Sequence, residues 1–447
     1  MFIASALAAS LTTVCLGVGD DRPPPLTFEQ HVDYIAWYND YVSKGKKGNA
    51  FDLYKGLYSD EEGRDGFPKP EGPAADQLQK AMFRSWTPKD FPELSAYLKK
   101  CRPYLATFKK AVKGASYWLP AAAGTEPLMK ITISVPTDTR HAARAMLAQA
   151  MMKRDAQAEA LNEACCSVLQ NARHLQQTDL TIGVLVATAE RQLVSNAVLA
   201  ALDEGILKGD DITAMYSSIH RNAPGPRGEE ARWLIIEWGA CLDLVQYLCP
   251  KGEIDAAHLK SYFGSDEEHG QSELTAKLLS AKIDPRATTR LLDEYFRGMV
   301  NIADGGMTLA KSRQLDEFVK SHTPALEENI LARAVMPSGP RAYLLQLRGE
   351  TMSRGTLLTL AVHAHHAKHG QWPENLDKID PTLGLKGLRE LRVDPCSDSG
   401  ADFIYKLKDG QPLLYSVADG KDDGGRHDPK WGEAGNGGDY VFWPYQR

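Results

Sequence analysis

Residues Thr137–Leu175 read TDTRHAARAMLAQAMMKRDAQAEALNEACCSVLQNARHL, in which two runs of small and apolar residues flank a charged segment. In the first run these residues recur at helical intervals, at Ala143, Leu147, Ala150 and Met151. In the second run they recur at Leu161, Ala164, Val168 and Ala172. Because three- and four-residue spacing puts side chains on one face of a helix, the stretch predicts two helices joined by a charged turn at 153–155.

This hairpin resembles a tetratricopeptide unit, in which small residues stand where two helices approach closely. Three more apolar segments downstream have the length of helices, at Thr181–Leu202, Glu229–Cys249 and Pro285–Ala303. No strict repeat period runs through the chain. We therefore expect a mainly α-helical body over 27–335, built as an irregular α-solenoid or helical bundle that is partly tetratricopeptide-like.

Two apolar stripes upstream predict further helices. One stripe comprises Phe28, Val32, Ile35, Tyr38 and Val42, and it predicts a helix that begins near Thr27. The other comprises Leu94, Tyr97, Leu98, Cys101, Leu105, Phe108 and Val112. Pro103 lies within the second stripe and predicts a kink or a break, because proline lacks the N–H of a helical hydrogen bond.

The composition is that of a folded protein without a strong charge bias. The chain has 447 residues, of which 43% are hydrophobic and 25% charged, and its net charge is -6. This length allows two or three domains at roughly 100–200 residues each. With a pI near 6.1 and no long basic block, the chain is not expected to bind nucleic acid.

The N-terminus, MFIASALAASLTTVCLGVGDD, is an apolar run of small residues that ends at two aspartates. Gly17-Val18-Gly19 has the small-x-small pattern that signal peptidases accept, so residues 1–19 are expected to be an export signal peptide. The run lacks Lys and Arg, and an uncleaved N-terminal anchor is the alternative. We therefore expect an exported protein, either periplasmic or secreted, or else anchored to the membrane by its N-terminus.

Six cysteines follow this segment, at Cys101, Cys165, Cys166, Cys241, Cys249 and Cys396. An even number permits disulfides in an exported protein. Most of these cysteines occupy apolar positions of predicted helices, which favours buried thiols that pack as small hydrophobic side chains.

The C-terminal part, 340–447, changes character. A long helix is expected from Arg341 to His369, ended by Gly370, because glycine readily takes the left-handed conformation of a helix cap. FIYKL and QPLLYSV lie on either side of Asp409-Gly410, which predicts a β-hairpin. YVFW, at Tyr440–Trp443, predicts a third strand.

This tail resembles the C-terminal head of type II secretion major pseudopilins. The motifs that carry the resemblance are His369-Gly370, Trp372-Pro373, Leu376, Asp394-Pro395, Tyr405, Tyr415-Ser416, Asp419-Gly420 and Gly438-Asp439. The whole chain is also similar to a group of exported helical proteins of planctomycete-type bacteria, through ARHLQQTDLTIGVLVATA at 172–189, and this resemblance implies no particular activity. A pilin needs a hydrophobic segment directly ahead of the tail helix, which the sequence lacks, so a fibre subunit is not expected.

The stretch LYSVADGKDDGG, Leu414–Gly425, places three aspartates on a glycine-rich backbone, as either a solvated turn or a loop around a cation. The resemblance implies calcium, with Asp419 and Asp439 at positions of pseudopilin ligands. Calcium takes about six to eight oxygen ligands from carboxylates and main-chain carbonyls. The expected calcium ligands are Asp419, Asp422, Asp423, Asp439 and Ser416. The residues of this loop that oppose a cation are Arg426, His427 and Lys430.

The segment HAHHAKHG places His363, His365, His366 and His369 on the tail helix. His365 and His369 are at i and i+4, so they share a helix face, and histidine pairs at this spacing hold zinc in metalloproteases. No HExxH, GxSxG, P-loop or Rossmann motif accompanies them in the sequence. A metal-dependent hydrolase that uses this zinc pair is one alternative function.

These features favour an exported cell-envelope binding or scaffold protein whose C-terminal loop is stabilised by calcium, with no catalysis expected. The expected partner is an envelope protein or peptide, and membrane contact is expected only through an uncleaved N-terminal segment. The alternatives are the hydrolase just described and an accessory component of a secretion or pilus-like assembly.

Overall fold

A computed structural model of the chain describes residues 22–58, 66–121, 126–130, 134–223, 232–263, 271–306, 308–336, 340–397, 400–417, 422–428 and 438–446. The expected export signal at 1–19 lies outside these ranges. Within them, no helix combines the length and the apolar character needed to cross a membrane.

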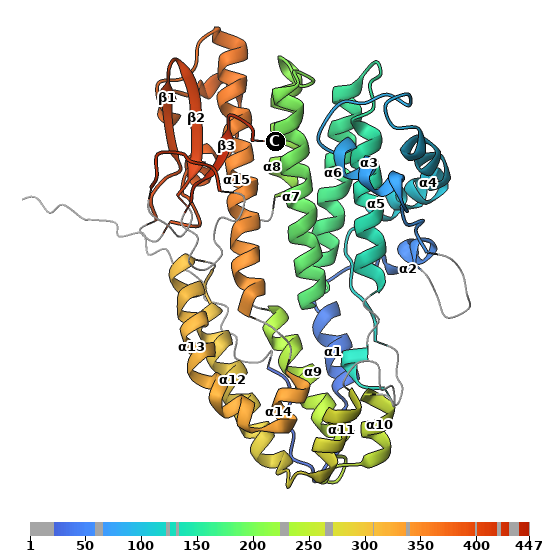
Figure 1. The fold of residues 1–447 in the computed structure, drawn as a ribbon. Coiled ribbons are helices and arrows are strands. Elements are labelled where there is room, and N and C mark those ends of the chain that lie inside the picture. The colour runs from blue at the N-terminus through green and yellow to red at the C-terminus, as the bar shows by residue number, and fades with distance from the viewer. Residues whose placement is uncertain are drawn as a thin grey trace, which may run out of the picture.

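Most of the described chain is α-helical, and a small antiparallel sheet lies near the C-terminus (Figure 1). The helices are α1 (Tyr34–Ser43), α2 (Phe51–Tyr54), α3 (Pro73–Ala81), α4 (Pro92–Ala111), α5 (Ser134–Ala150), α6 (Gln157–Gln176), α7 (Thr181–Asp203), α8 (Asp210–Asn222), α9 (Arg232–Leu248), α10 (Ala256–Phe263), α11 (Gln271–Ser280), α12 (Pro285–Ala303), α13 (Leu309–Glu328), α14 (Ile330–Val335), α15 (Pro340–His369) and α16 (Leu388–Leu391). The strands are β1 (Ile404–Lys408), β2 (Gln411–Ser416) and β3 (Tyr440–Trp443). The mainly helical class and the small sheet are confirmed, while the solenoid and tetratricopeptide-like character stays a prediction.

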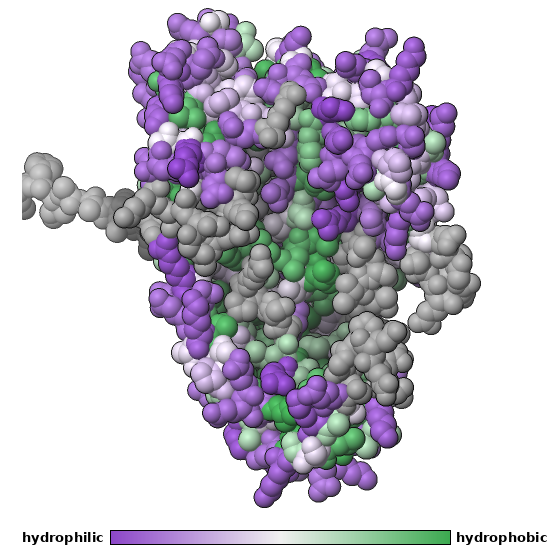
Figure 2. Space-filling model, viewed as in Figure 1, coloured by the Kyte–Doolittle hydropathy of each residue, from purple (hydrophilic) through white to green (hydrophobic). Residues whose placement is uncertain are grey.

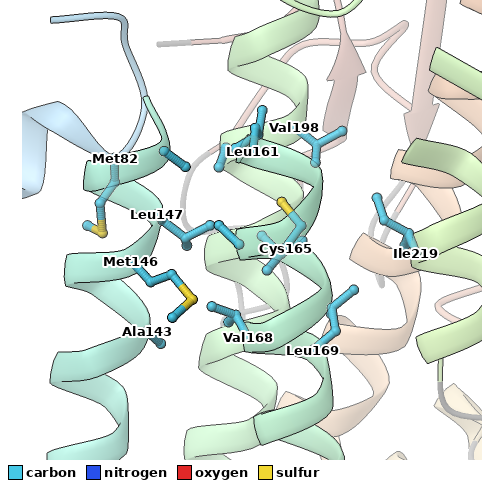
Figure 3. Packing of buried hydrophobic residues seen from close by; sticks show 14 of the residues in the cluster. Met82, Ala143, Met146, Leu147, Leu161, Cys165, Val168, Leu169, Val198 and Ile219 are labelled. Carbon is cyan, nitrogen blue, oxygen red and sulfur yellow. The ribbon is translucent and has the colours of Figure 1, made fainter. Parts of the chain in front are cut away.

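The helical hairpin predicted at Thr137–Leu175 is confirmed as α5 and α6, with the charged turn at 153–155 between them. Figure 3 shows Leu147 of α5, Leu161 of α6 and Val198 of α7 gathered in one cluster. All three side chains are 0% exposed. Burying each of them contributes about 1.5–3 kcal/mol, so packing of this apolar face fixes the hairpin.

The buried apolar residues form two main clusters. The first lies among α3 to α8, most of α15 and the inner face of the sheet, at the upper end of Figure 1. The second lies among α1 and α9 to α14, at the lower end. α15 belongs to both, because Tyr343 packs in the second cluster and Leu347 in the first. This long helix therefore joins the two ends of the helical body.

The N-terminal helix begins later than predicted. α1 starts at Tyr34 because the side chain of Asp33 caps it, accepting a hydrogen bond from the Ala36 N–H at 2.9 Å. Phe28 and Val32 therefore precede the helix, and Phe28 has a left-handed φ of 65°. The predicted stripe is therefore wrong at Phe28 and Val32 and confirmed at Tyr38 and Val42. The buried face of α1 is formed by Tyr34, Tyr38, Tyr41 and Val42.

The second predicted stripe is confirmed, since all its residues are buried on α4 or at its C-terminal cap. α4 nevertheless runs unbroken through Pro103, so the predicted break is wrong. An interior proline costs a helix about 3 kcal/mol. Burial of Cys101 and Leu105, on either side of the proline, offsets this cost.

The C-terminal module has the predicted order of elements. α15 ends at His369, and Gly370 follows with a φ of 71°. Asp409 and Gly410 form the hairpin turn between β1 and β2, with φ values of 52° and 75°. β3 pairs antiparallel with β2, and the sheet packs against α15 (Figure 1). The long helix and the sheet are therefore one packed unit, which we call the head.

The described cysteines pack as predicted. Those that are buried are Cys101, Cys165, Cys241, Cys249 and Cys396, and Cys166 is half-buried. None of these described cysteines is joined to another by a disulfide. Burial raises the pKa of Cys101 to about 11, as expected for a thiol in an apolar interior.

Candidate functional site

The expected calcium ligands that the structure describes lie at the end of β2 and in the two described segments that follow it. Asp422 and Asp423 begin the first segment, and Asp439 immediately precedes β3. Asp419 lies outside the described residues. The Tyr415 hydroxyl donates a hydrogen bond to Asp422 Oδ1 at 3.0 Å. The Tyr415 side chain of the central strand β2 thereby positions the acidic loop.

Asp439 and Asp423 bring two carboxyl groups into contact. Asp439 is 0% exposed, and its Oδ2 accepts a hydrogen bond from the Gly425 N–H at 2.7 Å. Its carboxyl group is also hydrogen-bonded to that of Asp423. Asp423 Oδ1 accepts a further hydrogen bond from the Arg426 N–H at 2.9 Å. Main-chain donors thus hold both acids in the loop.

The electrostatics of this pair favour a cation. Burial, followed by the Asp423 carboxylate, raises the pKa of Asp439 to about 7. Asp439 Oδ1 is buried and has no hydrogen-bond partner among the described residues. A buried oxygen without a partner is unfavourable, and two adjacent carboxylates repel each other when both are ionised. The residues present therefore fit a hard divalent cation, which would satisfy this oxygen and neutralise the pair.

Ser416 faces away from this pair. Its side chain is hydrogen-bonded to Asp394, whose pKa is raised by burial. Alternate residues of a strand point to opposite faces of a sheet, so Ser416 and Tyr415 lie on opposite faces. Since Asp422 contacts Tyr415, the structure does not bring the Ser416 side chain together with the loop carboxylates.

The described basic residues of the loop should repel a bound cation less strongly than the sequence indicates. The Arg426 side chain is 87% exposed, with its Nε 3.9 Å from Asp423 Oδ2. His427 Nδ1 accepts a hydrogen bond from the Val441 N–H at 3.3 Å, and burial lowers the pKa of this imidazole. His427 is therefore neutral at neutral pH. Lys430 lies outside the described residues.

The described residues supply only part of a calcium coordination sphere. Over the ranges given above, no group of three or more His, Cys, Asp or Glu side chains is arranged to hold a metal. Asp423 and Asp439 form an acidic pair, and the remaining oxygens of a calcium site would come from main-chain carbonyls and the predicted ligands Asp419 and Asp422.

The structure also brings His365 and His369 together, with their rings 4.6 Å apart. Both contact Asp380. His369 Nε2 lies 2.8 Å from Asp380 Oδ2, and the Asp380 N–H donates to His365 Nδ1 at 3.1 Å. The Asp380 carboxylate also pairs with Lys368 at 2.8 Å. Both imidazoles therefore make structural contacts. They hold the chain around Asp380 against the C-terminal end of α15.

The other two histidines pack against tryptophans. The His366 ring stacks on Trp372 at 3.8 Å, and the His363 ring lies 4.3 Å from that of Trp443. Burial lowers the pKa of His363 to about 4, so this ring is neutral. The four histidines thus serve to pack the head in this structure. Near-stoichiometric zinc that is lost when His365 and His369 are replaced would instead support the hydrolase alternative.

A second candidate site, which the sequence did not predict, is a cleft between residues 28–35 and α9. That segment was assigned to a helix, although Asp33 directly before the aromatic run is a recognisable N-cap signal. Asp243, which lines this cleft, was also not predicted as a site residue. With Glu237 it is one of two acids in the apolar run of α9, WLIIEWGACLDLVQYL, and an acid in such a run indicates a buried polar site.

Comparison with known proteins adds nothing to this geometry: no protein-family model, curated protein or solved structure matches the chain.

Proposed function

We propose that this chain is an exported cell-envelope binding or scaffold protein. Its helical body, an irregular and partly tetratricopeptide-like solenoid, presents a surface to an envelope protein or peptide. Its head, which resembles that of pseudopilins, is stabilised by calcium in the acidic loop. The observation that carries the calcium assignment is the buried, unpartnered Oδ1 of Asp439 beside Asp423.

The apolar surface of the body supports the binding role. α7 leaves Ile182, Leu185 and Leu193 half-buried. Figure 2 shows apolar residues at the surface in the middle of one face, with hydrophilic residues toward both ends. An apolar area bordered by polar residues is typical of surfaces that bind proteins or peptides.

Calcium fits the loop better than a softer metal, because the groups available are oxygens. Asp423 and Asp439 would hold the ion, and Asp419 and Asp422 are predicted to add carboxylate oxygens. Bound calcium would supply positive charge in place of the proton that otherwise separates the two carboxylates. Because the folded loop brings the two carboxylates together and calcium would remove their repulsion, calcium binding is coupled to folding of the loop.

Adding calcium to the full chain is expected to raise the melting temperature of the unit that contains the head. At about 100 times the dissociation constant, a ligand that binds only the folded state contributes about 2.7 kcal/mol. Asp439→Asn is expected to remove most of this gain, since it deletes the charge but keeps an acceptor for the Gly425 N–H. Calorimetry in calcium and in chelator measures the shift, and mass spectrometry measures bound calcium.

The matched control is Asp409→Asn, which makes the same charge change in the turn at the other end of β2. Asparagine tolerates the left-handed φ of 52° found at Asp409, so this variant should keep the full calcium response. An absent response in the unmodified chain, or an equal response in Asp439→Asn, contradicts the calcium site.

The calcium response also has an expected pH dependence. The pKa of Asp439 is raised from 3.8 to about 7, so its contribution to stability without calcium is complete below about pH 4 and is lost as pH rises through 7. Asp423, whose pKa is lowered, affects stability at more acidic pH. Because calcium replaces the proton, the melting shift should be larger at pH 8 than at pH 5.

A further inference from the structure

A cleft of about 640 Å³ lies at the lower end of the molecule in Figure 1, among α1, α9 and α10. One wall is the segment 28–35, and the other is formed by α9 and α10. Its lining combines acidic, histidine and aromatic side chains, among them Phe28, His31, Asp33, Asp243, Tyr247 and His258. None of these residues belongs to the calcium loop.

Asp243 is the most enclosed acid of the cleft. It is 8% exposed, and its Oδ2 accepts a hydrogen bond from the Leu128 N–H at 2.7 Å. Burial raises the pKa of Asp243 to about 6, while His31 acts to lower it and Asp33 to raise it. At neutral pH the carboxylate is therefore ionised, and it carries a negative charge on a largely buried side chain that borders an open cleft.

The other acids of the cleft have compensating partners. Glu29 and Glu126 each form an ion pair with a basic side chain, at 2.7 Å and 2.5 Å. Asp33 caps α1 through the hydrogen bond from a main-chain N–H of its first turn. Lys251 also lines the cleft. Asp243 is thus the carboxylate that gains most from a bound cation, because it is buried and lacks an ion-pair partner among the described residues.

Aromatic rings line the same cleft as this carboxylate. The rings of Tyr247 and His258 stack 4.4 Å apart at 18°. His258 Nδ1 lies 2.7 Å from the Tyr247 carbonyl oxygen, which fixes the imidazole. Phe28 lies on the opposing segment. Aromatic faces next to a carboxylate are the combination that recognises organic cations.

The segment that forms the wall is held in place at a conformational cost. The Gln246 side chain accepts from the Val32 N–H at 2.8 Å and donates to the Val32 carbonyl at 2.9 Å. Phe28 has a φ of 65°, a left-handed conformation that is unfavourable for a bulky residue. A strained backbone conformation persists only where the surrounding contacts hold it in place. Such residues are found most often at ligand-binding and active sites.

We propose that this cleft binds a small organic cation, a primary amine on an aromatic or apolar body. The ammonium group contacts the Asp243 carboxylate, and the body lies between Phe28 and the Tyr247–His258 rings. The site is independent of the calcium loop, and the experiment below is done in chelator so that the two proposals fail separately.

The test compares two probes that share one body, 2-phenylethylamine and 2-phenylethanol, by calorimetric titration of the full chain at pH 7.5. The amine is expected to bind at least about tenfold more tightly than the alcohol, which corresponds to about 1.4 kcal/mol for one buried charge pair. Asp243→Asn keeps an acceptor for the Leu128 N–H but removes the charge, so it should lose this preference. No saturable amine binding, or equal affinity for both probes, overturns the proposal.

Glu253→Gln is the matched control, because Glu253 is an exposed acid close in sequence to Lys251 and is not part of the cleft lining. It should bind the amine as the unmodified chain does. A loss equal to that of Asp243→Asn would assign the effect to general negative charge and overturn the site.

The amine affinity should also fall as pH decreases from 7.5 to 5. The pKa of Asp243 is about 6, so its carboxylate gains a proton and loses its charge over this range. The other titratable and charged groups of the cleft lining remain in Asp243→Asn, namely Glu29, His31, Asp33, Tyr34, Glu126, Tyr247, Lys251 and His258. The decrease should therefore be larger in the unmodified chain than in this variant. Identical pH profiles would overturn the role of Asp243. The pH comparison requires that Asp243→Asn folds. The comparison of amine with alcohol can be made on the unmodified chain and does not depend on the variant.

Discussion

Replacing Phe442 by alanine is expected to lower the free energy of unfolding by about 3–5 kcal/mol. Phe442 lies on β3, is 0% exposed, and packs in the first cluster with Phe403 at a ring distance of 5.7 Å and Tyr440 at 4.9 Å. Its ring also covers Gly355 on α15. Truncation would leave a cavity at the junction between the sheet and the long helix. Chemical denaturation of the full chain measures the loss.

Leu407→Ala is the control for this prediction. Leu407 lies on β1 and is 41% exposed, so its truncation should change the free energy of unfolding by less than about 0.5 kcal/mol. A loss at Phe442 no larger than that at Leu407 would show that the sheet does not dock on α15 through this ring.

Gly355 tests the same contact from the helix side. A Cβ added at Gly355 would overlap the Phe442 ring, so Gly355→Ala should destabilise by about 1–3 kcal/mol despite the higher helix propensity of alanine. In a Phe442→Leu background the added methyl group has room, so the two changes should couple by about 0.5–3 kcal/mol. A stabilising Gly355→Ala would contradict the close approach of helix and ring.

Replacing Glu190 by alanine is the second change with a large expected effect, a loss of about 3–5 kcal/mol. Glu190 lies on α7 and is 0% exposed, and Asn171 Nδ2 on α6 donates to both of its carboxyl oxygens at 2.8 Å. Asn171 is also 0% exposed. Alanine would leave a cavity and a buried amide without an acceptor. Thermal and urea unfolding of Glu190→Ala measure the loss.

The control is Glu163→Ala on α6, which removes an exposed acid that pairs with Lys109 at 2.8 Å. Exposed ion pairs contribute about 0–1 kcal/mol, so this change should be small. A similar small loss in Glu190→Ala would show that the pair between α6 and α7 does not stabilise the body.

Glu190→Gln separates the hydrogen bonds from the charge. Burial raises the pKa of Glu190 well above its ordinary value, although Asn171, Arg191 and Arg140 act to lower it. Because the pKa in the folded state is raised above 4.5, the contribution of Glu190 is complete below about pH 4.5 and is lost as pH rises. Glutamine does not titrate, and its amide could donate to the buried Asn171 Oδ1, which lacks a partner among the described residues.

The expected result is therefore a variant that gains stability relative to the unmodified chain as pH rises. Urea unfolding of both proteins at pH 5 and pH 8 measures the difference. Parallel pH profiles would mean that Glu190 titrates as it does in the unfolded chain.

The elements that the sequence predicted well are those whose signals are local. The apolar spacing in Thr137–Leu175 was sufficient for α5 and α6, and Asp409-Gly410 was sufficient for the hairpin of β1 and β2. α12 coincides with the predicted segment Pro285–Ala303. In each case neighbouring residues decide the backbone conformation and the buried face, so periodicity and turn chemistry carry the information.

The sites depended on contacts between distant parts of the chain. The segment around Val32 has apolar residues at helical spacing, but Gln246, which is 214 residues away in the sequence, binds its main chain and keeps it out of α1. The same segment forms one wall of the cleft that Asp243 lines. At the head, the sequence indicated the acids of the loop but not the contact of Asp423 with Asp439, because loop closure sets that geometry.

The sequence by itself therefore determined a mainly helical body, the terminal hairpin with its third strand, and the residue types of an acidic loop. The tertiary structure alone decided that α4 passes through Pro103, which carboxylates meet, and which acids are buried. The physical reason is that helix and turn preferences act over a few residues, whereas burial and pairing of charges depend on surfaces that only the folded chain brings together.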